Sequence, residues 1–343
     1  MSDMTPTPPG GPTNAEAPAS PAGPTAATSR WHVSKDSLSG FMPVVVLLAL
    51  LVVLSLAKPS FASLASAQVL AEEASILLVL CVGQTLVIML GGIDLALAAM
   101  ASLASILIGL WLPTNGIFAI MGVLAFTTLA GALTGFVHAK AQVPSFIVTL
   151  GTLGIWSGIA LALSAGTTIP VREHYDLIGW IAERTGPIPN SAVVALVFVG
   201  LVMVAMRQLP VGRYVEAIGL AEPAAIMSGI HTVRAKTLIF ALSGFGSGLA
   251  ALMLVSRMNS GAPSLADSLQ LPTVAAVVVG GTAITGGVGG LNRTIVGALI
   301  IMVLRVGMAV IGIDAAYEQI VYGTIVILAV GLTIDRARIL IVK

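Results

Sequence analysis

Residues 210–236, with the sequence PVGRYVEAIGLAEPAAIMSGIHTVRAK, interrupt a chain that is otherwise apolar enough to lie in a lipid bilayer. Charged side chains are costly inside hydrocarbon, so this segment must face water or another protein. The residues that impose this are Arg213, Glu216, Glu222, His231, Arg234 and Lys236. The segment therefore marks one water-facing side of a membrane protein.

A short helix is predicted over residues 222–229 of this segment. Pro223 suits the first helical position, where its missing N–H costs nothing. Glu222 places negative charge near the positive end of the helix dipole, and Gly229 suits the left-handed residue that ends a helix. A capped helix on a water-facing surface offers a docking site for a partner, and an ordinary connecting loop is the alternative.

The composition identifies an all-α polytopic membrane protein. Hydrophobic residues make up 57% and charged residues 9% of the 343 positions, whereas a soluble domain carries about 25% charged residues. The net charge of +1 argues against nucleic acid as a partner. Cys81 is the single cysteine, which excludes an internal disulfide and a cysteine-based metal site. The histidines are too far apart to form a metal signature.

The apolar runs predict about ten membrane-spanning helices, some of them short or broken. Residues 1–39, rich in Pro, Thr and Ala, are expected to form a disordered cytoplasmic tail, and residues 40–343 a transmembrane domain. An interfacial helix is expected within residues 59–73. The expected spans are 41–57, 74–90, 95–112, 117–137, 146–165, 191–206, 237–255, 271–284, 294–311 and 315–334.

The distribution of basic residues predicts that both termini and the segment 208–236 are cytoplasmic. With the N-terminus inside, eleven of the 16 Lys and Arg residues lie on the cytoplasmic side and four on the outside, as the positive-inside rule expects. Eight or nine spans remain alternatives if the glycine-broken pieces re-enter the membrane.

Two glycine-rich breaks interrupt the spans, GGID at 91–94 and GGTAITGGVGG at 280–290. Unwound backbone at membrane depth is tolerated where it lines a cavity or is packed in protein. Asp94 is a functional candidate because carboxylates are rare in membrane spans, and capping of the next helix is its alternative role. The predicted translocation-pathway residues are Gln84, Thr85, Gly91, Gly92, Asp94, Phe146, Thr149, Thr152, Asn259, Gly280, Gly281 and Thr282.

Five of these residues have uncharged polar side chains that suit hydrogen bonding to a neutral hydroxylated solute, although contacts between helices are their commoner role. They are Gln84, Thr85, Thr149, Thr152 and Asn259. The sequence contains no H-E-x-x-H or G-x-S-x-G motif, and its glycine-rich loop lacks a phosphate-binding lysine. An intramembrane enzyme is therefore not expected.

Four stretches resemble the membrane permeases of ribose-type ABC importers, which serve ribose, xylose, arabinose, galactose and other polyols. They are GQTLVI at 83–88 followed by GGIDL at 91–95, PSFIVTLGT at 144–152, the segment 212–230, and AAVVVGGTAITGG at 275–287. Ala96, Leu220, Ala221, Pro223 and residues 288–291 depart from the usual family pattern. The sequence therefore does not identify the substrate or the particular ATPase partner.

The resemblance implies a homodimeric permease in the bacterial inner membrane. It would receive solute from a periplasmic sugar-binding protein and would be driven by cytoplasmic ABC ATPase subunits, which use ATP, while this chain binds no cofactor. The residues it assigns to ATPase coupling are Gly212, Arg213, Glu222, Pro223, Ala224, Ala225, Met227, Ser228, Gly229 and Ile230. An ion-coupled secondary transporter of a small neutral solute is the alternative, and a membrane scaffold is a third.

Overall fold

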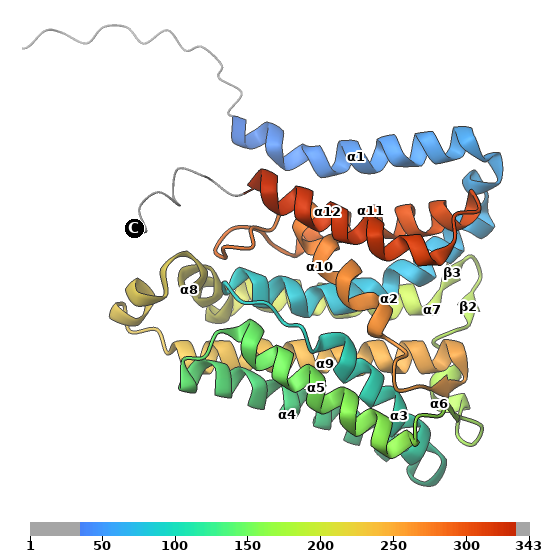
Figure 1. Ribbon diagram of the computed structural model, residues 1–343, viewed down its shortest axis with the longest axis horizontal. Coiled ribbons are helices and arrows are strands. Elements are labelled where there is room, and N and C mark those ends of the chain that lie inside the picture. The colour runs from blue at the N-terminus through green and yellow to red at the C-terminus, as the bar shows by residue number, and fades with distance from the viewer. Residues whose placement is uncertain (1–34, 334–343) are drawn as a thin grey trace, which may run out of the picture.

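A computed structural model describes residues 35–333, and most of them are helical. Figure 1 shows the long helices running between two ends of the molecule. The helices are α1 (Lys35–Ala57), α2 (Leu64–Met89), α3 (Leu97–Asn115), α4 (Ile117–Ala141), α5 (Ser145–Ser164), α6 (Asp176–Gly179), α7 (Asn190–Gln208), α8 (Pro210–Met227), α9 (Thr232–Met258), α10 (Gln270–Val279), α11 (Leu291–Val310) and α12 (Glu318–Thr333).

The all-α membrane architecture predicted from composition is confirmed. Within residues 35–333, seven helices are long and apolar enough to cross a membrane: α2, α3, α4, α5, α7, α9 and α11. Three shorter apolar helices, Met42–Ala57, Asp267–Val279 and Glu318–Ala329, bring the set close to the ten expected spans. The start of α1 and the last described turn of α12 lie on the same side of the molecule as α8 (Figure 1), as expected for a chain that crosses the membrane an even number of times.

Three helices form the core of the bundle. In α2, 89% of the apolar window is buried, and α3 and α9 follow with 78% and 72%, whereas α5 buries only 17%. The apolar faces of α4, α5 and α7 are consequently left for lipid. Close approach of α4 and α9 depends on small residues, since a Cβ atom on Gly244 would lie 2.1 Å from the carbonyl oxygen of Thr127.

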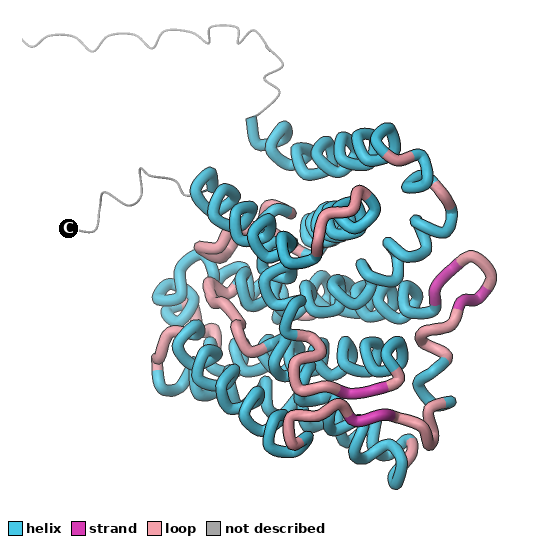
Figure 2. The backbone as a smooth tube through the Cα atoms, turned by 45° about the vertical axis from the view of Figure 1, so that its right-hand side comes forward, coloured by secondary structure: helices cyan, strands magenta, loops and turns pink. Residues whose placement is uncertain are grey.

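Short strands and turns gather at the end opposite α8 (Figure 2). Strand β1 (Ile169–Pro170) pairs antiparallel with β4 (Ser260–Gly261), and β2 (Arg184–Thr185) pairs with β3 (Ile188–Pro189). This end contains the polar segment 166–190 that the sequence placed outside the membrane.

Several predicted boundaries differ from the observed ones. The expected interfacial helix at 59–73 is a 3₁₀ turn at Pro59–Ala62 followed by the first turns of α2, because residues 64–73 contain no helix breaker. The helix after Asp94 begins at Leu97 instead of residue 95, and α10 ends at Val279. Helix α1 begins at Lys35, inside the predicted tail, whose residues 1–34 lie outside the described part.

Candidate functional site

Helix α8 consists of two helical pieces joined at Ala221, whose backbone is extended (φ −161°, ψ 94°). Pro223 explains this break, because in a continuous helix its ring would clash with the carbonyl group of Gly219 and one hydrogen bond would be lost. The second piece follows directly after Ala221 and so begins at Glu222, where the sequence predicted the start. The short helix expected from the sequence is therefore present as the second half of α8.

The second piece ends at the predicted glycine. Gly229 adopts φ +81°, its N–H donates to the carbonyl of Ile226 at 2.9 Å, and the N–H of Ile230 donates to the carbonyl of Ala225 at 3.1 Å. This pair of bonds is the Schellman motif, which satisfies the last carbonyl groups of a helix. We name residues 222–230 the coupling knob.

The coupling knob presents apolar side chains to water. Met227 is 89% exposed and Ile226 is 54% exposed. Sequence reasoning included Met227 but missed Ile226. Exposed apolar groups on a protruding, well-ordered helix are typical of a protein-binding surface. Of the other predicted coupling residues, Arg213, Pro223, Ala224, Ser228 and Gly229 are exposed, whereas Gly212 and Ala225 are buried.

An ion pair fastens the coupling knob to the bundle. The Nζ of Lys236, on α9, lies 2.6 Å from Oε1 of Glu222, and the lysine side chain is only 7% exposed. A buried charge requires such a partner, and removal of either one is costly. Glu222 therefore positions the knob against α9 in addition to its favourable place at the helix start.

The first half of α8, which leads into the coupling knob, lies against the end of α2 and the second glycine-rich break. A Cβ atom on Gly219 would lie 1.9 Å from the carbonyl oxygen of Met89 and 2.4 Å from the backbone nitrogen of Gly287. The N–H of Gly287 donates to the same Met89 oxygen at 2.9 Å. The first half of α8, the end of α2 and the loop 280–290 therefore meet at one backbone junction.

The break after α2 is packed in protein. Asp94 is 6% exposed, its Oδ1 accepts the N–H of Ala96 at 3.0 Å, and its Oδ2 accepts the hydroxyl of Ser243 at 2.9 Å. Ser145 and Thr149 bond the backbone N–H and carbonyl of Ile93 at 2.9 and 3.2 Å. Both carboxylate oxygens thus have protein partners. The N-cap of α3 is Ala96, so Asp94 holds the turn just before the helix and is not its N-cap residue.

Gln84 differs from the other pathway candidates because its amide has no partner. The side chain is fully buried, and neither its nitrogen nor its oxygen makes a hydrogen bond within the described residues. Its neighbour Thr85 is satisfied by the carbonyl of Cys81 at 2.6 Å and the hydroxyl of Thr294 at 2.7 Å. An unpaired amide costs stability, so Gln84 is the strongest candidate for contact with a passing solute.

The remaining pathway candidates are only partly brought together: Thr149 bonds the first break, and the two breaks touch each other, since a Cβ atom on Gly286 would lie 2.8 Å from the Cα of Gly91. Phe146 is 50% exposed on the bundle surface, and Asn259 ends α9 in a left-handed conformation at the far end from the coupling knob. Thr152 bonds the carbonyl of Thr149. Gly91, Gly92, Gly280, Gly281 and Thr282 lie in the two breaks. The structure therefore places the predicted residues in separate groups, with Gln84 and Thr85 in the core.

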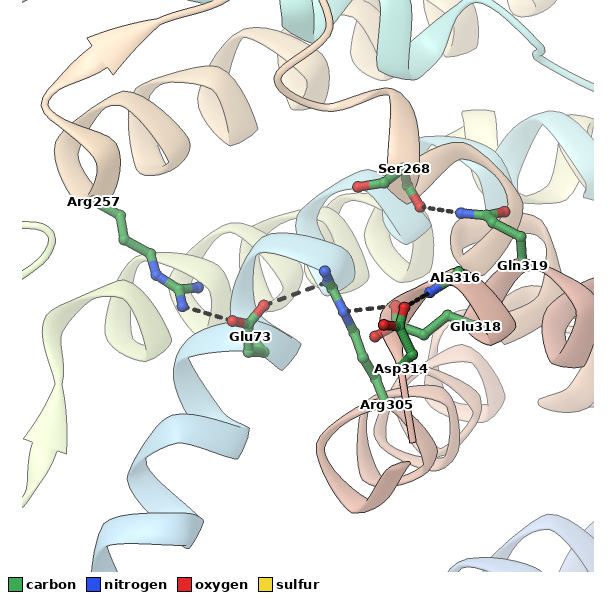
Figure 3. Close-up of polar contacts among 8 residues, drawn as sticks. All are labelled: Glu73, Arg257, Ser268, Arg305, Asp314, Ala316, Glu318 and Gln319. Atoms are coloured by element: carbon green, nitrogen blue, oxygen red, sulfur yellow. Dashed lines mark hydrogen bonds and ion pairs between the residues drawn. The ribbon is translucent and has the colours of Figure 1, made fainter. Parts of the chain in front are cut away.

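A cluster of ion pairs at the end opposite the coupling knob was missed by sequence reasoning (Figure 3). Glu73 on α2 pairs with Arg257 on α9 at 2.6 Å and with Arg305 on α11 at 3.5 Å. Arg305 also pairs with Glu318 at the start of α12 at 3.2 Å. We name these four residues the outer ionic cluster. The cluster connects four helices, and no spacing in the sequence predicts which of them pair. The sequence offered one indication of it, because Arg305 is a charged residue within an expected membrane span.

Glu73 and Gln84 share one face of α2. They are eleven positions apart, which is about three helical turns or about 16 Å. Leu77 and Leu80 lie between them on this face, and both are fully buried. The buried amide of Gln84 is thus separated from the outer ionic cluster by an apolar layer.

We expect Glu73→Gln to loosen the end of the bundle that carries the outer ionic cluster, because Arg257 and Arg305 lose their shared carboxylate. Cys81 is the single cysteine and is fully buried, so its reaction with a water-soluble thiol reagent reports opening. A loss of about 1.4 kcal/mol would raise the open population and the labelling rate about tenfold.

Glu72→Gln is the matched control for this experiment, since Glu72 pairs instead with Arg184 of the neighbouring loop at 2.7 Å. It should label at the rate of the unaltered protein. Equal rates for Glu73→Gln and the unaltered protein would show that the outer ionic cluster does not hold the helices closed.

Comparison with known proteins confirms the resemblance inferred from the sequence. The family model described as branched-chain amino acid transport system / permease component matches residues 67–330. Ribose import permease protein RbsC of Escherichia coli is 30% identical over 311 residues, covering 88% of this chain and 94% of that protein. RbsC of Haemophilus influenzae is 34% identical over 298 residues, covering 83% and 90%.

The L-arabinose ABC transporter permease protein AraH of Azospirillum brasilense is 31% identical over 294 residues, covering 84% of this chain and 85% of that protein. No solved structure matches the chain. The family match covers most of the sequence, including both breaks and the coupling knob. The chain belongs to the branched-chain amino acid transport system / permease component family of ABC transporter permeases.

Proposed function

We propose that this chain is the transmembrane permease subunit of an ATP-driven importer for a monosaccharide or related polyol. The observation that carries the proposal is the coupling knob, a capped helix fixed to the bundle by the pair Glu222–Lys236. The similarity to permeases named for ribose and arabinose supports the solute class.

The proposed partners follow from the same features. Cytoplasmic ABC ATPase subunits bind the coupling knob, a periplasmic sugar-binding protein delivers solute at the end that carries the outer ionic cluster, and a second copy of the chain completes a homodimer. The chain itself binds no cofactor, and its partners hydrolyse ATP. In this arrangement the protein spans the bacterial inner membrane with both termini in the cytoplasm.

The geometry suggests how ATPase movement reaches the solute. Force on the coupling knob passes through the contact of Gly219 with Met89 and Gly287 to the end of α2. Gln84 lies on that helix, so displacement of α2 would expose its amide to solute hydroxyl groups. An amide offers both donors and an acceptor, which suits a neutral polyol.

Uptake measurements in cells distinguish this function from ion-coupled transport. Labelled ribose, arabinose and fructose serve as probes, and ionophores collapse the ion gradients while ATP is maintained. We expect uptake of at least one sugar to continue. Uptake that stops with the gradients would favour the secondary transporter, for which Asp94 is poorly suited because both its oxygens have partners.

A further inference from the structure

A wide pocket of about 1020 Å³ lies beside the coupling knob, between the end of α4 and the start of α9. Lys140, His231 and Arg234 contribute to its lining, and so do the apolar residues Phe136 and Leu238. Helices α4 and α9, which form the two sides of the pocket, are both long and apolar enough to span a membrane. The pocket thus combines cationic groups with an apolar wall.

The positive charge of this pocket is not neutralised by the protein. Within residues 35–333, Lys140 and Arg234 take part in no ion pair, and the pocket lining contains no carboxylate. Glu222, the acid of the coupling knob, is already paired with Lys236 at 2.6 Å. Clustered cations without counter-charges attract an anion.

Two further features of the pocket suit an anion with acceptor oxygens. The hydroxyl of Thr237, which lines the pocket, is buried and has no hydrogen-bond partner within the described residues. Helix α9 is 27 residues long, and its N-cap, His231, makes no side-chain hydrogen bond to it. Residues of its first turn line the pocket, so the positive end of its dipole lies at the pocket and its first N–H groups have no side-chain cap.

The apolar side of the pocket, formed in part by Phe136 and Leu238, indicates that the ligand also has an apolar part. Phe136 is 47% exposed and Leu238 is 54% exposed, and both belong to helices of the membrane domain. An inorganic anion would make no use of these side chains, whereas an acyl chain would cover them. Basic pockets between membrane helices on the cytoplasmic side are suited to lipid headgroups.

We propose that this pocket binds an anionic phospholipid. The headgroup phosphate contacts Lys140, Arg234 and the start of α9, and an acyl chain lies along Phe136 and Leu238. Ile226 and Ile230 of the coupling knob line the same pocket. The bound lipid therefore also packs against this side of the knob, and it leaves Met227, which does not line the pocket, free for the ATPase.

The test measures lipid retained by the purified full-length protein from an equimolar mixture of phosphatidylglycerol and phosphatidylcholine, by mass spectrometry of the intact complex. We expect the unaltered protein to prefer phosphatidylglycerol about tenfold or more, because two cations act on one headgroup. The double variant Lys140→Gln with Arg234→Gln should lose this preference. Arg207→Gln, which removes an exposed charge from the end of α7, should keep it, as should Lys140→Arg.

Measurements on the unaltered protein keep the proposal testable if the double variant fails to fold. Glycerol phosphate in excess should leave phosphatidylglycerol bound, and its displacement would indicate a site for a free anion only. Equal retention of the two lipids would overturn the proposal. Displacement of the lipid by the ATPase subunit would likewise overturn it, by assigning the pocket to the protein interface.

Discussion

Replacing Gly229 with aspartate is expected to abolish sugar uptake while leaving a normal amount of the protein in the membrane. A Cβ atom at this position would meet no atom within 4 Å, so the side chain has room, and aspartate is one of the few residues that accept a left-handed backbone at modest cost. The proposed ATPase surface would cover it, however. A carboxylate buried there without a partner costs about 2–5 kcal/mol, or about thirtyfold to several thousandfold in binding.

Gly229→Asn is the matched control for this prediction. Asparagine has nearly the same size as aspartate and tolerates the left-handed conformation that Gly229 adopts (φ +81°), but it has no charge. It should retain most of the uptake. The measurements are sugar uptake and membrane abundance for both variants. Normal uptake in Gly229→Asp would remove the case for the coupling knob as the ATPase contact.

Replacing Gln84 with leucine is expected to strengthen the fold and to reduce uptake severely. The amide is fully buried, and both of its polar atoms lack partners. Each unsatisfied atom costs about 1–3 kcal/mol, so an apolar side chain of similar size relieves that cost. If the amide serves the solute, as we propose, its removal leaves the solute's hydroxyl groups unpaired in the pathway.

Thr85→Val provides the contrasting variant. The Thr85 hydroxyl is bonded to the carbonyl of Cys81 and to Thr294, so its loss should lower thermal stability. The two variants should therefore shift the melting temperature of the purified protein in opposite directions. Full uptake by Gln84→Leu would show that this amide takes no part in transport.

Local features of this fold were predictable from the sequence because neighbouring residues determine them. Pro223 and Gly229 set the start and end of the coupling knob, and paired glycines marked both breaks. The long apolar runs gave the membrane helices. In each case a backbone preference or a desolvation cost acts within one segment.

Contacts between distant segments were not predictable. The carboxylate of Asp94 accepts a hydrogen bond from Ser243 on α9, and Glu73 forms an ion pair with Arg305 on α11. Both contacts depend on how the helices pack, which no local sequence pattern predicts. For the same reason some of the pathway candidates, chosen by residue type, lie apart from the others, with Phe146 and Asn259 exposed and far from the core. Burial without a partner distinguished Gln84, and only the three-dimensional structure shows that property.

Reconstitution of the purified chain in liposomes tests the central claim most directly. The claim predicts no accumulation of labelled sugar by the chain alone, with or without an ion gradient. It predicts accumulation once the ATPase, the sugar-binding protein and ATP are added, and loss of accumulation when a hydrolysis-deficient ATPase replaces the active one. Accumulation of sugar by the chain alone, with no second polypeptide hydrolysing ATP, would contradict the claim.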